Sequence, residues 1–303
     1  MSARGFSFPE FKWWMGVVER WDDPEELGRL GVRIYGYHPE DLGKLPKDKL
    51  PWAIVSNNIQ SSSLSGLGDA PVGVVKGTTV WGFFQDGENA EVPVIVGTLP
   101  GKPDAPESGK GFADPDGKYP DKPEESDVNR LSRGKTNGTF IEKIKSGLDT
   151  AKVAFGGTWK ELQTKYAAKY PWNSVHESRS GHVHEVDDTE GKERISQYHK
   201  SGTFYEIHPD GSKVTKVVKD NYEIVHGNGF ILVKGNVKIN VQGNASVLVG
   251  GNCDLEVMGN MKEHISGNYE MQVDGSAKWN VTGDWARSSG THISDTAPTI
   301  DHN

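Results

Sequence analysis

The stretch GNVKINVQGNASVLVGGN, residues 235–252, contains a glycine followed by a polar residue at every eighth position. The same spacing continues on both sides of the stretch, and the residue after each glycine is asparagine, serine or aspartate. The repeated glycines are Gly227, Gly235, Gly243, Gly251, Gly259, Gly267, Gly275 and Gly283. Because eight is neither a helical period nor the period of the common solenoid repeats, these glycines predict a chain that turns a corner once per octad.

An aliphatic residue stands two positions before each glycine, at Val225, Val233, Val241, Val249, Val257, Ile265, Val273 and Val281. Between corners, hydrophobic and polar residues alternate: Val237 and Ile239 flank Lys238. This pattern is typical of a β-strand with one buried face. Glycine followed by asparagine or aspartate tolerates a positive φ, so we expect left-handed backbone at the corners. We predict that the residues from Val233 to Val281 in this series line the interior of a β-prism.

Two ways of winding such strands fit the period equally well. One is a single-chain triangular β-helix with three octads per coil, and the other is three intertwined chains that each supply one strand to each face in turn. In the second arrangement each octad advances by about 4.8 Å, so the repeat would form a rod roughly 40 Å long.

A few ionisable residues are candidate ligands for an ion. Glu263 stands where other octads place a hydrophobic residue, so the lumen there is either widened and hydrated or holds a cation. His182 and His184 are two apart on a predicted strand and would share one face, as metal ligands or as part of a polar strand. Near the C-terminus, His292 and His302 do not form a His-x-His pair, but an ion at the tip is a further possibility.

Composition excludes several classes of protein. The 303 residues contain no apolar run of about 18 residues, and the N-terminus has no signal-peptide core, so we expect neither a membrane span nor secretory export. Cys253 is the single cysteine and cannot form an intrachain disulfide. The net charge of -8 argues against a nucleic-acid partner.

The N-terminal hundred residues contain five strand-like segments separated by Gly, Pro and Asp. They are residues 13–21, 30–38, 50–57, 78–86 and 92–100. Five short strands favour an OB-fold barrel. An OB-fold can bind single-stranded nucleic acid in a basic, aromatic groove, but residues 1–100 hold nine Lys or Arg against thirteen Asp or Glu. We therefore interpret this barrel, residues 1–100, as a structural collar.

The middle of the chain is predicted to be a linker with two short helices, residues 101–173. Gly, Pro, Asp and Lys dominate up to about residue 139. Ile141, Ile144, Leu148, Ala151 and Phe155 then recur at helical spacing, and Thr158 with Glu161 resembles a capping box that opens a second helix. Residues 174–226 are predicted to be β-strands that enter the stalk, and residues 227–303 to be the octad repeat and the tip.

The octads, together with the preceding segment SVHESRSGHVHEVDDTEGKERISQYHKSGTFYEIHPDGSKV at 174–214, resemble the stalk of the central spike of contractile-tailed phages. That family includes the tail-associated lysozymes of the baseplate hub, and VgrG of type VI secretion shares its core. The resemblance implies an all-β homotrimer whose octads form an intertwined triple-stranded β-helix. It also implies a virion protein of the tail baseplate, assembled in the host cytoplasm, that punctures the host cell envelope when the sheath contracts.

The resemblance implies partners as well. A separate trimeric baseplate hub protein would hold the barrels, since no hub domain precedes them as it does in VgrG, and a PAAR-type tip protein could cap the C-terminus. A VgrG-like spike, a peptidoglycan-degrading tail lysozyme and a receptor-binding fibre are the alternatives.

We expect no lysozyme domain between the barrel and the stalk, because the linker is far shorter than a phage muramidase. Glu107 and Asp116 have the spacing of the first two muramidase residues, but Lys122 stands where the family has threonine. We therefore expect no enzyme activity and no cofactor.

Overall fold

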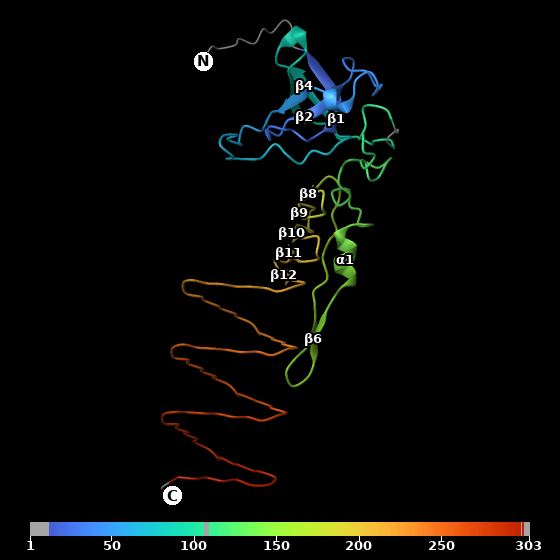
Figure 1. Ribbon diagram of the computed structural model, residues 1–303. Helices are drawn as coiled ribbons and strands as arrows, with labels where there is room; N and C mark the ends of the chain where they lie inside the picture. Colours follow the sequence, from blue (N-terminus) through green and yellow to red (C-terminus); the bar gives the residue numbers. More distant parts are fainter. Residues whose placement is uncertain (1–11, 106–108, 298, 300–303) are drawn as a thin grey trace. The chain divides into compact units, whose positions relative to one another are not determined.

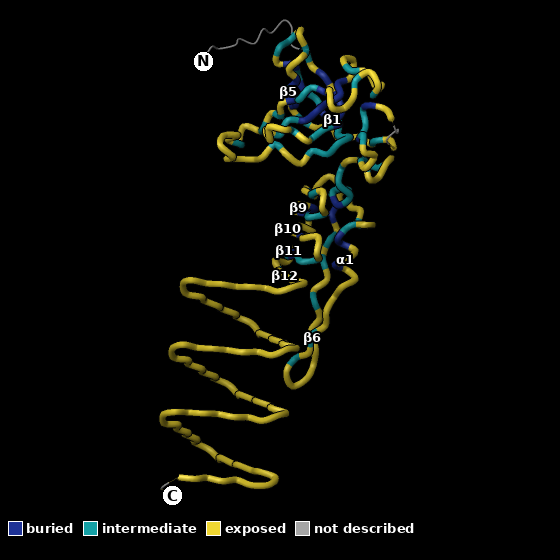
Figure 2. The backbone as a smooth tube through the Cα atoms, viewed as in Figure 1, coloured by how far each residue is buried: buried dark blue, intermediate teal, exposed yellow. Residues whose placement is uncertain are grey.

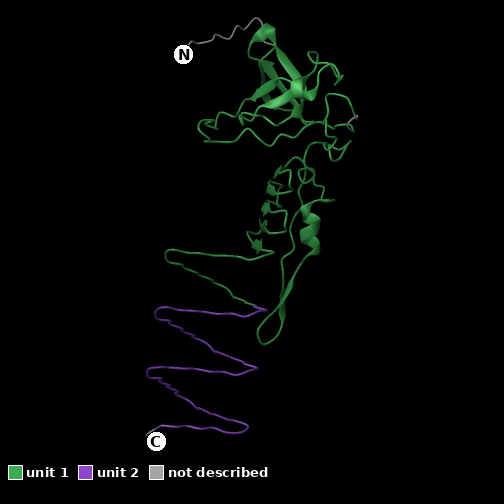
Figure 3. Ribbon diagram, in the orientation of Figure 1, with its two compact units in different colours: residues 1–240 green, residues 241–303 purple. Residues whose placement is uncertain are grey.

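The computed structural model describes residues 12–105, 109–297 and 299. The chain divides into two compact units, residues 1–240 and residues 241–303 (Figure 3). Among the described residues, no helix has the length and hydrophobicity required to cross a bilayer.

A closed barrel of five strands forms the N-terminal part of the first unit (Figure 1). Its strands are β1 (Trp13–Arg20), β2 (Leu30–Ile34), β3 (Trp52–Val55), β4 (Thr79–Phe84) and β5 (Pro93–Thr98). They follow one another around the barrel in the order β1-β2-β3-β5-β4, and only β3 and β5 pair in parallel. Two single-turn 3-10 helices, η2 (Lys47–Lys49) and η3 (Gly87–Asn89), lie in the connections. The prediction of five strands in a small closed barrel is confirmed.

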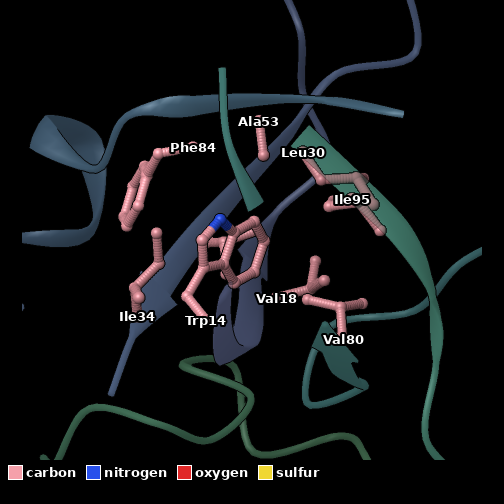
Figure 4. Packing of buried hydrophobic residues seen from close by; sticks show 9 residues of the cluster. Trp14, Val18, Leu30, Ile34, Ala53, Val80, Phe84 and Ile95 are labelled. Atoms are coloured by element: carbon pink, nitrogen blue, oxygen red, sulfur yellow. The ribbon is translucent and has the colours of Figure 1, made fainter. Parts of the chain in front are cut away.

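The barrel interior is packed with hydrophobic side chains from every strand. Trp14 lies in the middle of this core, surrounded by aliphatic side chains and Phe84 (Figure 4). The other buried members are Val18, Leu30, Val32, Ile34, Ala53, Val80 and Ile95. Gly82 on β4 permits close packing, since a Cβ there would collide with the backbone oxygen of Val94 on β5. Hydrophobic packing and a glycine that a larger residue could not replace therefore both serve barrel closure.

A buried ion pair fastens a later loop to the barrel. Arg33 on β2 donates from Nε to Glu19 Oε1 of β1 at 2.7 Å, and both side chains are almost completely buried. Glu19 Oε1 also accepts a hydrogen bond from the backbone N–H of Phe112 at 2.7 Å. The ring of Phe112 stacks on Tyr35 with a centroid separation of 4.2 Å. Because a buried charge is tolerated when its hydrogen bonds are satisfied, this carboxylate holds the loop in place.

The described residues between 101 and 139 contain no helix or strand element, as expected for a linker. Their order comes from local hydrogen bonds instead. Asp114, which is buried, accepts bonds from the backbone N–H groups of Asp116, Lys118 and Tyr119. Carboxylates in loops commonly satisfy backbone donors in this way.

The helical prediction for residues 141–166 is only partly right. Helix α1 (Phe140–Ser146) forms where Ile141 and Ile144 face the core, but it ends at Gly147. Strands β6 (Thr150–Lys152) and β7 (Thr158–Lys160) then make a hairpin in place of the rest of the first predicted helix and the start of the second. Its turn includes Gly156 and Gly157, both with left-handed φ.

The predicted capping box fails because both of its residues have other partners. Thr158 pairs with Lys152 in the hairpin ladder. Glu161 accepts hydrogen bonds from the backbone of Asp149 and from the ammonium group of Lys216. These longer-range contacts outweigh the local helical pattern.

A five-stranded antiparallel meander follows. It comprises β8 (Asn173–Glu177), β9 (Val183–Asp187), β10 (Arg194–Tyr198), β11 (Phe204–Ile207) and β12 (Lys213–Lys216). One end of its buried face carries Val183, Tyr198 and Phe204, which pack against Phe140 and Ile141 of α1. The ring of Phe140 stacks on Tyr198 with a centroid separation of 4.4 Å.

From residue 217 onward the described residues form no strand and no helix. Their side chains are exposed almost throughout, as the yellow tube beyond β12 shows (Figure 2). Where the sequence predicts β-strands, the octads are therefore short segments between bends that do not pair as strands.

Candidate functional sites

The predicted octad corners coincide with bends of the backbone. Bends fall at residues 226–227, 234–235, 242–243, 250–251, 258–259, 266–267, 274–275, 282–283 and 290–291. Each of the eight predicted corner glycines, from Gly227 to Gly283, is the second residue of one such pair. The chain thus changes direction once per octad.

The expectation of left-handed backbone at these glycines is wrong. None of the eight has a φ in the left-handed range, although Gly156 and Gly157 in the hairpin turn do. The corners are open bends rather than hydrogen-bonded turns, so no residue has to adopt that conformation. A Cβ built on any of the eight would meet no atom of the chain within 4 Å. Nothing within one chain explains why glycine is repeated there.

The residues predicted to line a prism are not buried within the chain. Their exposed fractions lie between 46% and 55% for Val233, Val241, Val249, Val257, Ile265, Val273 and Val281. Other octad residues are more exposed still, with Leu248 at 95%. Since burial of such side chains drives folding, half of this hydrophobic surface lacks a partner in the single chain.

The predicted ion candidates lie on different parts of the chain: Glu263 on the octads, and His182 and His184 at the five-stranded sheet. Glu263 is exposed on the octads. His184 lies on β9, directly opposite His176 on β8, whereas His182 precedes β9 and its ring contacts His199 at a centroid distance of 4.4 Å. Within the residues that the structure describes, no group of three or more His, Cys, Asp or Glu could hold a metal ion. His302 lies outside the described residues, and His292 is exposed.

A network of buried charges on the five-stranded sheet was missed by the sequence interpretation. Arg194 lies between two carboxylates, bonding Glu206 at 2.7 Å through Nη1 and Glu185 through Nη2, and all three side chains are buried. Thr164 donates to Glu206 at 2.8 Å, and Nε2 of His208 is 2.9 Å from the same carboxylate. Burial raises the pKa of Glu185 despite the nearby Arg194. Burial also raises the pKa of Tyr166, whose ring lies against Arg194.

Period-two alternation could have revealed this network. Glu185 and Asp187 fall on the same face as the buried Val183, and Arg194 and Ser196 fall on the same face as Tyr198. Thr164 and the backbone of Lys165 bond Glu206, and the ring of Tyr166 lies against Arg194, so this segment covers the charged part of the sheet.

The outer surface of the barrel carries a second feature, an aromatic face formed by Trp13, Met15, Trp81 and Phe83. The register of β1 and β4 places Trp13 opposite Phe83 and Met15 opposite Trp81. Ring centroids of Trp13 lie 5.3 Å from Trp81 and 6.0 Å from Phe83. Trp13 is 58% exposed and Met15 is 49% exposed. Aromatic residues and methionine at such exposure are typical of protein–protein interfaces.

The carboxylates with muramidase-like spacing do not form a catalytic pair in the described residues. Glu107 lies outside them. Asp116 is bonded by Lys76 and Lys47, and the hydrogen bond from Lys76 lowers its pKa.

Comparison with known proteins adds independent information. The family model of the Gp5 N-terminal OB domain matches residues 36–190. The match begins after β2, includes β3 to β9 and ends just beyond β9, so it covers just over half of the chain.

Two phage proteins are similar in sequence. Protein Gp5 of Vibrio phage KVP40 is 41% identical over 267 residues, which are 76% of this chain and 63% of that protein. Pre-baseplate central spike protein Gp5 of Enterobacteria phage T4 is 39% identical over 128 residues, which are 40% of this chain and 22% of that protein. The chain thus spans less than two thirds of either relative. With its five-stranded barrel and its matched OB domain, the chain belongs to the Gp5 family of phage central spike proteins.

Proposed function

We propose that this chain forms a homotrimeric, cell-puncturing spike at the distal end of a contractile phage tail. The octads of three chains wind into a triangular β-prism that is driven through the host cell envelope when the sheath contracts. The barrels hold the spike in the baseplate of the virion. Rigidity, rather than catalysis, is the function.

The observation that carries the proposal is that the described octad residues bend regularly but form no strand ladder with any described part of their own chain. No strand is assigned among the described octad residues, and the valines two positions before the glycines remain about half exposed. A single-chain β-helix would pair octads three apart and bury those valines. The described residues contain no such ladder, which favours partner strands from other chains.

The partner strands must share the eight-residue period, because every octad lacks a strand partner and leaves its aliphatic residue half exposed in the same way. A second and third copy of the same chain meet that condition without any further assumption. Glycine at each bend then has a reason that one chain does not supply, since a neighbouring chain could pass close to a residue that has no Cβ. Three copies fit a triangular section with one corner per octad.

The aromatic face of the barrel supports docking to a separate baseplate hub protein. It is apolar, and the exposed Val96 and Ile54 on neighbouring strands extend it. The acidic balance of residues 1–100 makes single-stranded nucleic acid the poorer candidate for this surface. A PAAR-type protein at the C-terminal end would complete the tip.

We assign no peptidoglycan-hydrolysing activity to the chain. The muramidase pattern is incomplete in this chain, because Lys122 stands where that family has threonine. The purified chain should leave the turbidity of a suspension of bacterial cell walls unchanged over hours, whereas a lysozyme clears it in minutes. Clearing by the purified chain would disprove a purely structural role.

Light scattering behind size exclusion tests the oligomer directly. Three chains of 33.2 kDa give a mass near 100 kDa. A mass near 33 kDa would contradict the trimer and leave the octads as a single-chain structure. Because intertwined chains separate only by unfolding, the trimer should also resist SDS until it is heated.

A further inference from the structure

Four histidines surround one cavity on the five-stranded sheet. The cavity has a volume of about 530 Å³ and is lined by His176, His182, His184 and His199, with Gln197 and Tyr205 beside them. Imidazole is the side chain most often used to bind zinc, nickel and copper ions in proteins. The arrangement of these rings decides which of them are available as ligands.

His176 and His184 are direct cross-strand neighbours. They are register partners in the antiparallel ladder of β8 and β9, so their side chains rise from the same face of the sheet. Directly opposite residues have Cβ atoms about 4.5 to 5.5 Å apart, which lets two imidazoles reach one ion. Both residues are exposed, and neither ring forms a hydrogen bond within the described residues.

The other two histidines are already committed to the backbone. The N–H of Ser201 donates to Nδ1 of His199 at 3.1 Å, and the N–H of Lys200 donates to Nδ1 of His182 at 3.5 Å. A neutral ring that accepts at Nδ1 carries its own hydrogen on Nε2, so neither nitrogen offers a free lone pair. These two rings also contact each other.

We propose that His176 and His184 form a binding site for a divalent transition-metal ion of the zinc class. Each histidine supplies one imidazole nitrogen, and water fills the remaining positions, because the described residues offer no third His, Cys, Asp or Glu ligand there. Gln197, the register partner of His184 on β10, can accept a hydrogen bond from a bound water. The donor set excludes magnesium and calcium, which require oxygen ligands. The site lies within one sheet, so it does not depend on the trimer.

Equilibrium dialysis of the full chain against zinc chloride, with metal analysis of both compartments, tests the site. We expect one zinc ion per chain at pH 7.5. His176→Gln and His184→Gln should each weaken binding at least tenfold, while His264→Gln, an exposed octad histidine, should leave it unchanged. Lowering the pH to 5.5 should release the metal, because a protonated imidazole is not a ligand.

Several results would overturn the proposal. One is that the wild-type chain binds no zinc, and another is that His176→Gln and His184→Gln bind zinc as tightly as the wild type. A ratio of one ion per three chains would also contradict the proposal, because it would place the ligands on different copies of the chain. His182→Gln provides a second control, since it removes a histidine of the same cavity that the geometry does not assign to the metal. A loss of binding in His182→Gln equal to that in His184→Gln would also contradict the assignment. Circular dichroism of each variant shows whether the sheet is still folded.

Discussion

The barrel and the octads use glycine in opposite ways. At Gly82 in the barrel, a Cβ would collide with the backbone of β5, so the reason for glycine is visible within one chain. At the eight octad glycines, a Cβ would meet nothing, and the backbone has no unusual φ. The barrel also buries its own hydrophobic residues, whereas the octads leave theirs half exposed. Glycine is repeated at every octad bend, and contacts within one chain do not explain it, so the repeat indicates an assembly of several chains.

Gly82→Val should have the largest effect on folding. The new side chain would force β4 away from Val94 of β5, and we expect a loss of about 4 kcal/mol or more in the free energy of barrel unfolding. Urea unfolding followed by tryptophan fluorescence measures it, and the loss should not depend on protein concentration. A stable barrel in this variant would show that Gly82 is not required for contacts within one chain, and would remove its contrast with the octad glycines.

Gly259→Val should leave the single chain unaffected but prevent assembly. Its Cβ has open space in one chain, so any effect must come from a neighbouring chain. We expect the mass by light scattering to fall from about 100 kDa to the monomer value of 33.2 kDa. The matched control is Lys262→Ala in the same octad, which should remain assembled. If both variants assembled, or both failed to assemble, the result would contradict the close approach of a neighbouring chain to the glycines at the bends.

Arg194→Met tests whether the five-stranded sheet is stabilised within its own chain, like the barrel. The change leaves Glu185 and Glu206 buried without their cation, and such a loss costs about 3 to 5 kcal/mol. Thermal unfolding should show the loss, while Lys192→Met on the exposed side of the neighbouring loop should change little. Adding Glu185→Gln and Glu206→Gln should restore part of the stability, and no recovery would mean that the charge network is not the cause.

Glu125→Gln should have the smallest effect, a loss of stability near neutral pH that disappears as the pH falls toward 2. Hydrogen bonds from Arg130 and then Arg133 lower the pKa of Glu125 from 4.5 to about 2. A lowered pKa in the folded state means that the carboxylate stabilises the fold above pH 4.5, and that this contribution is lost as the pH falls toward 2. The variant should therefore show a shallower loss of stability between pH 4.5 and 2. Glu124→Gln, an exposed neighbour, should keep the wild-type slope.

Regular patterns predicted much of the molecule. The five barrel strands follow from alternation and turn residues, and the observed strands lie within one or a few residues of the predicted segments. The bends follow from glycine spacing alone. In both cases the residue pattern is local and repeated, so the prediction does not depend on contacts between residues far apart in the sequence.

The failures have a common physical cause, since each depends on contacts far along the chain. A hairpin in which Glu161 bonds Lys216 takes the place of the predicted helical continuation, and Thr164 and Tyr166 contact the buried charges of Glu206 and Arg194. The pairing of His176 with His184 depends on a strand register that no local motif indicates. Tertiary contacts of this kind override local propensity.

The bond between the Glu19 carboxylate and the Phe112 backbone has a mechanical consequence. The chain leaves β5 at Thr98, but this bond and the stacking of Phe112 on Tyr35 attach it again to β1 and β2. A force applied to the chain beyond Phe112 would therefore reach the barrel at β1 and next to β2 as well as through β5. Each of these strands is hydrogen-bonded on both sides in the closed barrel, so the load would be shared among them.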